Sequence, residues 1–78
     1  MQFTPENLDE LNVLVLFKLT TTQEGIKVHK NAPTAKIEAT RRLFQKGLIT
    51  LEDGGYLTTI GHEAVEQAHT IFGLLNPV

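Results

Sequence analysis

Residues 45–61, QKGLITLEDGGYLTTIG, constrain the fold more than any other part of the chain. Lys46-Gly47 is a typical helix end, with a cation in the last turn and a glycine just beyond it. Two short β-prone segments, residues 48–51 and 56–58, flank a turn whose glycines can adopt positive φ. The threonines that follow can cap a new helix. The stretch therefore predicts a helix, a β-hairpin and a second helix in direct succession.

The length and composition limit what can surround this hairpin. The 78 residues predict a single domain, 1–78, with a net stability of only a few kcal/mol, roughly 3–5. The absence of cysteine excludes disulfides and thiolate metal sites and fits a cytoplasmic protein. The longest apolar run, Val13 to Phe17, is far shorter than the ~20 residues of a membrane span, and residues 1–10 are too polar for a signal peptide. We therefore expect no membrane contact.

Periodic apolar residues predict three main helices around the hairpin. The first begins at Thr4-Pro5-Glu6, which combines a cap, a proline in the first turn and an acid, and its apolar stripe continues to Leu19. A second apolar face on this helix indicates either a central position in the core or contact with a second copy of the chain. The last helix is expected over residues 59–75, where Asn76-Pro77 ends it.

The middle helix should begin near Pro33 and end near Lys46. Helical spacing defines a buried side, which consists of Ile37, Thr40, Phe44 and Gly47. The opposite side is basic with small residues among the charges, and it consists of Ala35, Glu38, Ala39, Arg42, Gln45 and Lys46. We expect Arg42 and Lys46 to face solvent, with Arg42 close enough to Glu38 to form an ion pair.

The segment between the first two helices is open to two interpretations. Thr21-Thr22-Gln23-Glu24 matches a capping box, which predicts a short helix from about Thr22 to Val28. Apolar and polar residues alternate over residues 26–29, which predicts a short strand nearly as well. Gly25 weakens both interpretations.

Charge is distributed unevenly along the chain. The net charge is −2, yet the segment from Lys30 to Gly47 carries five Lys or Arg residues against one Glu, a local charge of +4. An acidic protein can still bind DNA through one basic face. The charge pattern therefore indicates the middle helix as the candidate nucleic-acid contact.

Residues 22–58 resemble the DNA-binding half of winged helix-turn-helix regulators of the MarR-like and PadR-like kind. Thr22 would open the first helix of the motif, Lys30-Asn31-Ala32 would be the turn, and Gly47-Leu48-Ile49 matches the GLI that starts the wing. The resemblance implies an α+β, mostly helical fold: a winged helix-turn-helix with three main helices and a small antiparallel β-hairpin wing. The strings FTPE, TTQEGIKVH and DGGYLT also resemble a small family of bacterial proteins without an assigned function.

The resemblance implies a transcription regulator or accessory factor that binds double-stranded DNA as a dimer, with the middle helix as recognition helix. Arg42 would contact a guanine, and Gln45 or Glu38 an adenine or cytosine. The residues facing the major groove would be Thr34, Ala35, Glu38, Arg42 and Gln45. The residues neutralising phosphates would be Lys30, Lys36, Arg41 and Lys46.

Two departures from the family pattern matter, and the first favours another partner. The predicted wing tip, Glu52-Asp53, is acidic, where a wing that enters the minor groove usually carries Arg or Lys. Lys27 stands where the first helix of the motif generally buries a small residue. The alternative hypothesis is therefore a winged-helix module that docks a protein partner and does not bind DNA.

A metal site or an active site finds little support in the sequence. His62, Glu66 and His69 share one face of the last helix at a spacing that can hold zinc. We interpret them as a polar outer face, because no residue is placed to orient the imidazoles. The chain has no Ser, no Cys and no glycine-rich phosphate loop. We therefore expect no metal, no cofactor and no enzymatic activity.

Overall fold

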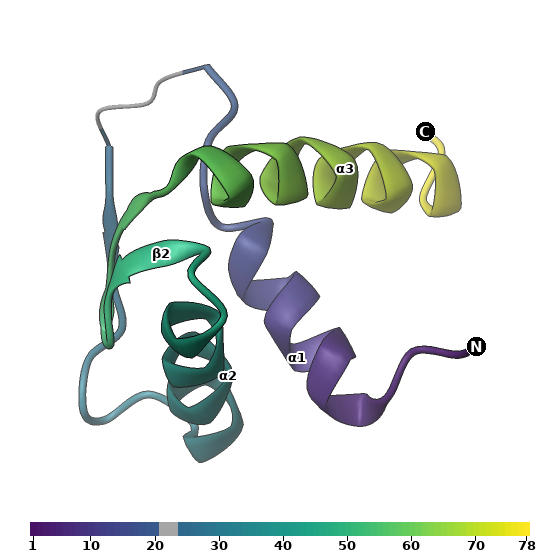
Figure 1. Ribbon diagram of the computed structural model, residues 1–78. Helices are drawn as coiled ribbons and strands as arrows, with labels where there is room; N and C mark the ends of the chain where they lie inside the picture. Colours follow the sequence, from purple (N-terminus) through teal and green to yellow (C-terminus); the bar gives the residue numbers. More distant parts are fainter. Residues whose placement is uncertain (21–23) are drawn as a thin grey trace.

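Figure 1 shows the computed structural model, which describes residues 1–20 and 24–78. The helices are α1 (Pro5–Leu14), α2 (Thr34–Gln45) and α3 (Thr59–Leu75), and the strands are β1 (Ile26–Lys27), β2 (Ile49–Leu51) and β3 (Gly54–Leu57). The strands form one antiparallel sheet in the order β1-β3-β2. The predicted α+β class, mostly helical with a small hairpin, is confirmed, and the arrangement is compatible with a winged-helix-like fold.

Helix α1 begins as predicted and ends earlier than predicted. Thr4 and Asn7 form a capping box, in which each side chain accepts a hydrogen bond from the other residue's backbone N–H at 3.1 Å. The helix was expected to continue to Leu19, but Val15 is its C-cap. Tighter turns follow, in which the Phe17 N–H donates to the Leu14 carbonyl, and they place the Phe17 side chain in the core. Leu19, the end of the predicted stripe, is 46% exposed, so past Val15 the chain is neither helical nor buried along that stripe.

The described part of the ambiguous segment is a strand. Ile26–Lys27 pairs with β3, while residues 21–23, and with them most of the capping-box match, lie outside the described residues. Within residues 24–33 no helix precedes α2, and a turn closed by the Ala32 N–H and the His29 carbonyl leads into it. A strand and a turn therefore stand where the first helix of a helix-turn-helix motif was predicted.

The core lies where the three helices meet one face of the hairpin (Figure 1). Helices α1 and α2 pack side by side, and the first half of α3 crosses above α1. The largest fully buried side chains come from all three helices, the turn after α1 and the hairpin, and they are Val13, Phe17, Thr40, Leu43, Ile49 and Val65. The second half of α3 extends beyond this core, since every residue from position 70 onward is exposed.

Helix α2 is rotated relative to the prediction. Its buried residues are Ala39, Thr40 and Leu43, whereas Phe44 remains 37% exposed. Ala39 was expected to face outward and is fully buried in the cluster that includes Leu43 and the α1 side chains. The rotation arises because α2 packs against α1 as well as against the hairpin, which the apolar periodicity of α2 alone does not specify.

The hairpin forms as predicted, with glycine at the strained positions. Gly47, Gly54 and Gly55 have φ of 80°, 132° and 77°, which side chains other than glycine rarely adopt. Strand β3 begins at Gly54, earlier than the predicted Tyr56. Thr58 is the N-cap of α3: its hydroxyl oxygen accepts from the Gly61 N–H at 3.0 Å and its O–H donates to the Gly47 carbonyl at 2.6 Å. This residue joins the end of α2 to the start of α3.

A comparison of two glycines in α3 tests this junction. A Cβ at Gly61 would collide with the backbone carbonyl of Leu48, whereas a Cβ at Gly73 would meet nothing within 4 Å. Gly61→Ala should lower the free energy of unfolding by about 2 kcal/mol, because the backbone must shift to relieve the overlap. Gly73→Ala should raise it by roughly 0.5 kcal/mol through helix propensity. Urea unfolding followed by circular dichroism measures both, and equal effects would contradict this packing.

Candidate nucleic-acid interface

Two of the predicted DNA-binding cations are bound to a buried carboxylate on α1. Arg42 Nε donates to Glu10 Oε2 at 2.6 Å, and Lys46 Nζ donates to Glu10 Oε1 at 2.6 Å. Arg42 also donates from Nη2 to the Glu6 carbonyl at 3.3 Å. Glu10 is 6% exposed, and Asn7 lies beside its carboxylate at 3.5 Å. We call Glu10, Arg42 and Lys46 the Glu10 clamp.

Charge balance within the clamp keeps Glu10 ionised. Burial raises the pKa of the Glu10 carboxyl, but the hydrogen bonds from Lys46 and Arg42 together outweigh it, and the net pKa lies below the ordinary value. The hydrogen bond to Glu10 likewise raises the pKa of the Arg42 guanidinium. The clamp is therefore a charged contact between α1 and α2 at neutral pH.

The clamp corrects the prediction that Arg42 faces solvent, whereas Lys46 is exposed as predicted although its Nζ binds Glu10. Arg42 is half-buried and pairs with Glu10 across two helices, in place of the predicted pairing with Glu38 within one helix. Sequence reasoning missed Glu10, although a signal was present. Glu10, Val13, Leu14 and Phe17 follow helical spacing, so the acid lies on the stripe that turned out to be the core.

The clamp predicts a specific pH dependence of stability. Glu10→Gln should lower the free energy of unfolding at pH 7 by about 2 kcal/mol, because it removes the negative charge and leaves one oxygen to accept from two cations. Since the folded pKa of Glu10 is lowered, its contribution is complete above the unfolded value, ~4.3, and is lost as pH falls through the folded value. The difference between wild type and variant should therefore shrink below about pH 4.

Glu66→Gln is the matched control, because Glu66 is an exposed carboxylate on α3. It removes the same charge and should change stability little at either pH. Urea titrations from pH 7 to acid measure all three proteins. A constant difference between wild type and Glu10→Gln at every pH would contradict the clamp.

The remaining predicted residues lie on the solvent side of α2. Thr34, Glu38, Arg41 and Gln45 are all exposed and follow one another at intervals of four, three and four residues. They therefore form one continuous stripe that is exposed along its whole length. We call these four residues the outer stripe of α2.

Ala35 and Lys36 lie toward α1 and not on the outer stripe. They line a cavity of about 320 Å³ between the start of α2 and α1, together with Asp9, Asn12 and Leu16. Lys36 is half-buried, and its carbonyl accepts a hydrogen bond from the Thr40 hydroxyl at 2.8 Å. Ala35 is exposed at the edge of this cavity.

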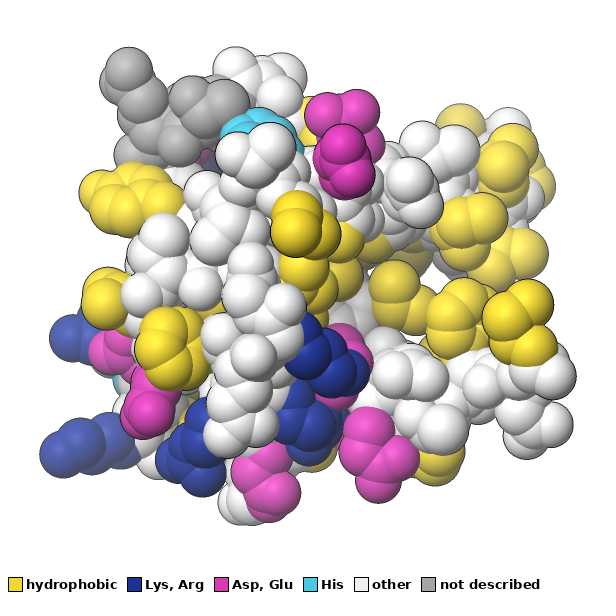
Figure 2. Space-filling model, in the orientation of Figure 1, with side chains coloured by type: hydrophobic (Ala, Val, Ile, Leu, Met, Phe, Trp, Pro, Cys, Tyr) yellow, Lys and Arg dark blue, Asp and Glu magenta, His cyan; other side chains and the backbone are white. Residues whose placement is uncertain are grey.

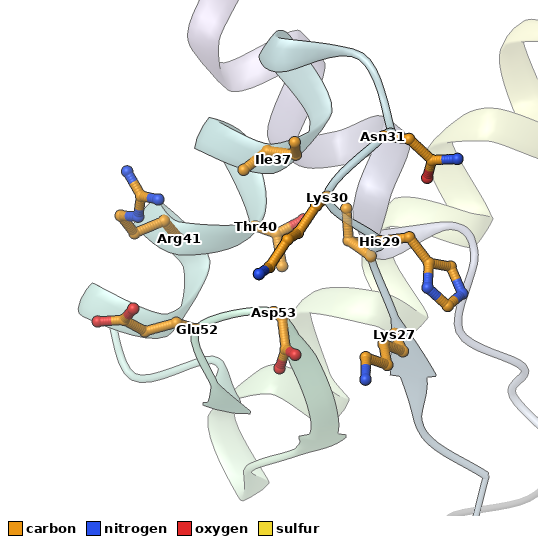
Figure 3. Close-up of a pocket in the computed structure, with 10 residues that line it drawn as sticks. Lys27, His29, Lys30, Asn31, Ile37, Thr40, Arg41, Glu52 and Asp53 are labelled. Carbon is orange, nitrogen blue, oxygen red and sulfur yellow. The ribbon is translucent and has the colours of Figure 1, made fainter.

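A larger cavity of about 670 Å³ separates α2 from the hairpin tip (Figure 3). Its floor is apolar, with Val28 and Ile37, and its rim carries charges of both signs. Figure 3 shows Lys30 extending into the space between α2 and the hairpin tip, where Asp53 lies. The charged residues of the rim are Lys27, Lys30, Arg41, Glu52 and Asp53. Cations and acids thus share one surface next to the outer stripe.

The acidic hairpin tip is held in place by β1. The Val28 N–H donates to the Asp53 carbonyl at 2.8 Å, which continues the pairing of β1 with β3. Gly54 permits this approach, because a Cβ there would collide with the Ile26 carbonyl. The hairpin therefore packs between β1 and the start of α3 and is not a free wing.

The two histidines of α3 are half-buried, whereas the predicted polar outer face would be exposed. His69 Nε2 lies 2.7 Å from the Phe17 carbonyl, which links α3 to the end of α1. His62 is also half-buried, whereas Glu66 is exposed. Within the described residues, no three His, Cys, Asp or Glu side chains are grouped so that they could hold a metal ion. His69 therefore has a structural contact of its own.

Comparison with known proteins assigns the chain to a family without giving it a function. The profile of a family of unknown function, DUF5669, matches residues 1–76, so the chain belongs to that family. Comparisons with curated proteins and with solved structures found no match. Among the described residues, no helix combines the length and apolar character needed to cross a lipid bilayer.

Proposed function

We propose that this protein is a small DNA-binding module, a transcription regulator or accessory factor, that places α2 in the major groove. The observation that supports the proposal is the outer stripe of α2, a polar helix face that carries a cation and is exposed along its whole length. The major groove admits one such helix. Exposed Lys27 and Lys30 flank the stripe on the segment that precedes α2.

The roles within the proposed interface differ from those expected on sequence alone. Arg41 replaces Arg42 as the residue that contacts a guanine edge, because Arg42 is held by Glu10. Gln45, Glu38 and Thr34 lie on the same stripe and contact neighbouring bases. Lys27, Lys30 and Lys36 neutralise phosphates, whereas Lys46 belongs mainly to the clamp. The interface is therefore only weakly basic, and few phosphates are contacted.

A mobility shift with random-sequence duplex DNA at several salt concentrations tests the proposal. Three to four phosphate contacts give a log–log salt slope of about −3. Lys30→Ala should make this slope less steep by about one. Arg41→Ala should weaken binding about tenfold or more, whereas Arg42→Ala should affect stability more than binding.

Lys18→Ala is the charge-matched control for these variants. Lys18 is exposed, pairs with Glu24 at 3.5 Å, and lies in the segment after α1 that runs past α3 (Figure 1). It should leave the salt slope unchanged. Absence of retention even at low salt would overturn the DNA proposal, because every DNA-binding protein retains a non-specific electrostatic attraction under those conditions.

A second candidate function is protein binding, which the hairpin tip favours. Glu52 and Asp53 repel phosphates, and they face Lys30 and Arg41 across a cavity with an apolar floor. A mixed-charge rim around apolar residues is typical of a protein contact. Glu52→Gln with Asp53→Asn separates the candidates: this variant should bind DNA more tightly if α2 lies in the groove, and an unchanged DNA affinity favours the protein partner.

A further inference from the structure

The second half of α3 carries an apolar face that the rest of the described chain leaves uncovered. Gly61, Val65 and Ala68 are buried, and the same helical stripe continues as Phe72 and Leu75, which are 56% and 75% exposed. The stripe remains apolar along the whole helix, but its second half extends beyond the core and is therefore exposed. Figure 2 shows these hydrophobic side chains gathered beyond the core, with a hollow beneath them.

Further exposed apolar side chains lie near the start of the chain. Phe3 and Leu8 are 66% and 51% exposed, and Figure 1 shows the N-terminal segment and the start of α1 on the same side of the core as the second half of α3. The second half of α3 and the start of the chain together present an apolar surface of several neighbouring residues. This surface is larger than the single, scattered apolar residues of an ordinary protein surface. We call it the α3 overhang, and its exposed members are Phe3, Leu8, Ile71, Phe72 and Leu75.

The charges around the overhang indicate what covers it. From Gln67 to Val78 the chain has no Asp, Glu, Lys or Arg. Neither a charged partner surface nor DNA gains an attraction from this half of α3. An anionic membrane gains none either, because the helix lacks the cations that flank membrane-surface helices. The surface is complementary to another uncharged apolar helix, and the second half of α3 is itself such a helix.

We propose that two copies of this chain associate through the α3 overhang, with the two α3 helices antiparallel about a two-fold axis. Each Phe72 and Leu75 then packs into the hollow of the other copy, above Leu8. An isologous contact of this kind needs no charge pairing, since each copy presents the same apolar patch. The five side chains of each copy bury on the order of 1,000 Å² in total, the lower limit for a specific interface. This inference does not depend on DNA binding.

The mass in solution, measured by sedimentation velocity over about a hundredfold range of concentration, tests the dimer. Wild type should rise from 8.7 kDa toward twice that value, because a small interface dissociates on dilution. Leu75→Glu should remain at 8.7 kDa at every concentration, because the dimer would bury two unpaired carboxylates. Since Leu75 is exposed, the fold should persist, and circular dichroism checks that it does.

Ile60→Glu is the matched control, because it introduces the same carboxylate and Ile60 is 63% exposed on the first turn of the same helix, outside the overhang. It should dimerise like wild type. A wild-type mass of 8.7 kDa throughout would overturn the proposal, as would a Leu75→Glu protein that still dimerises. Binding of a monomeric wild type to phosphatidylcholine vesicles would overturn it as well, because the overhang would then be a membrane contact.

Discussion

The ionised carboxylate of Glu10, buried between two helices, is the contact on which the arrangement of α1 and α2 depends. Two cations on α2 neutralise it at 2.6 Å, and removing them would leave a charge in the core of a small domain. Glu10 lies on the same stripe as Val13 and Phe17, so the charged contact and the apolar contacts require the same rotation of α1. The clamp and the core therefore specify one mutual arrangement of the two helices.

That arrangement decides which cations are available to a partner. Arg42 and Lys46 occupy the side of α2 next to α1, so Arg41 is the cation on the outer stripe. The local charge of +4 along the sequence overstates the positive charge at the surface, because Glu10 offsets part of it. The same rotation brings the outer stripe beside the hairpin tip, where Asp53 shares a cavity with Lys30. A partner of this face therefore meets charges of both signs.

The parts of the fold that sequence predicted are those that local chemistry determines. The Thr4 cap and the Gly47 helix end depend on residues within a few positions and were placed correctly, and the cap of α3, predicted only as one of the threonines before it, is Thr58. The strand at Ile26 depends on Gly54, which is far along the chain, so local patterns left helix and strand open. The site was predicted less well than the fold, because the pairing of Arg42 with Glu10 spans 32 positions.

Nuclear magnetic resonance of the arginine Nε–H groups tests most directly whether the clamp determines the binding face. Wild-type protein labelled with ¹⁵N would be titrated with a short random-sequence duplex at low salt. The Arg41 Nε–H signal should shift on addition of DNA, while the Arg42 Nε–H signal, hydrogen-bonded to Glu10, should stay in place. A shift of the Arg42 signal with an unchanged Arg41 signal would contradict the account, because the clamp would then open to let Arg42 contact DNA.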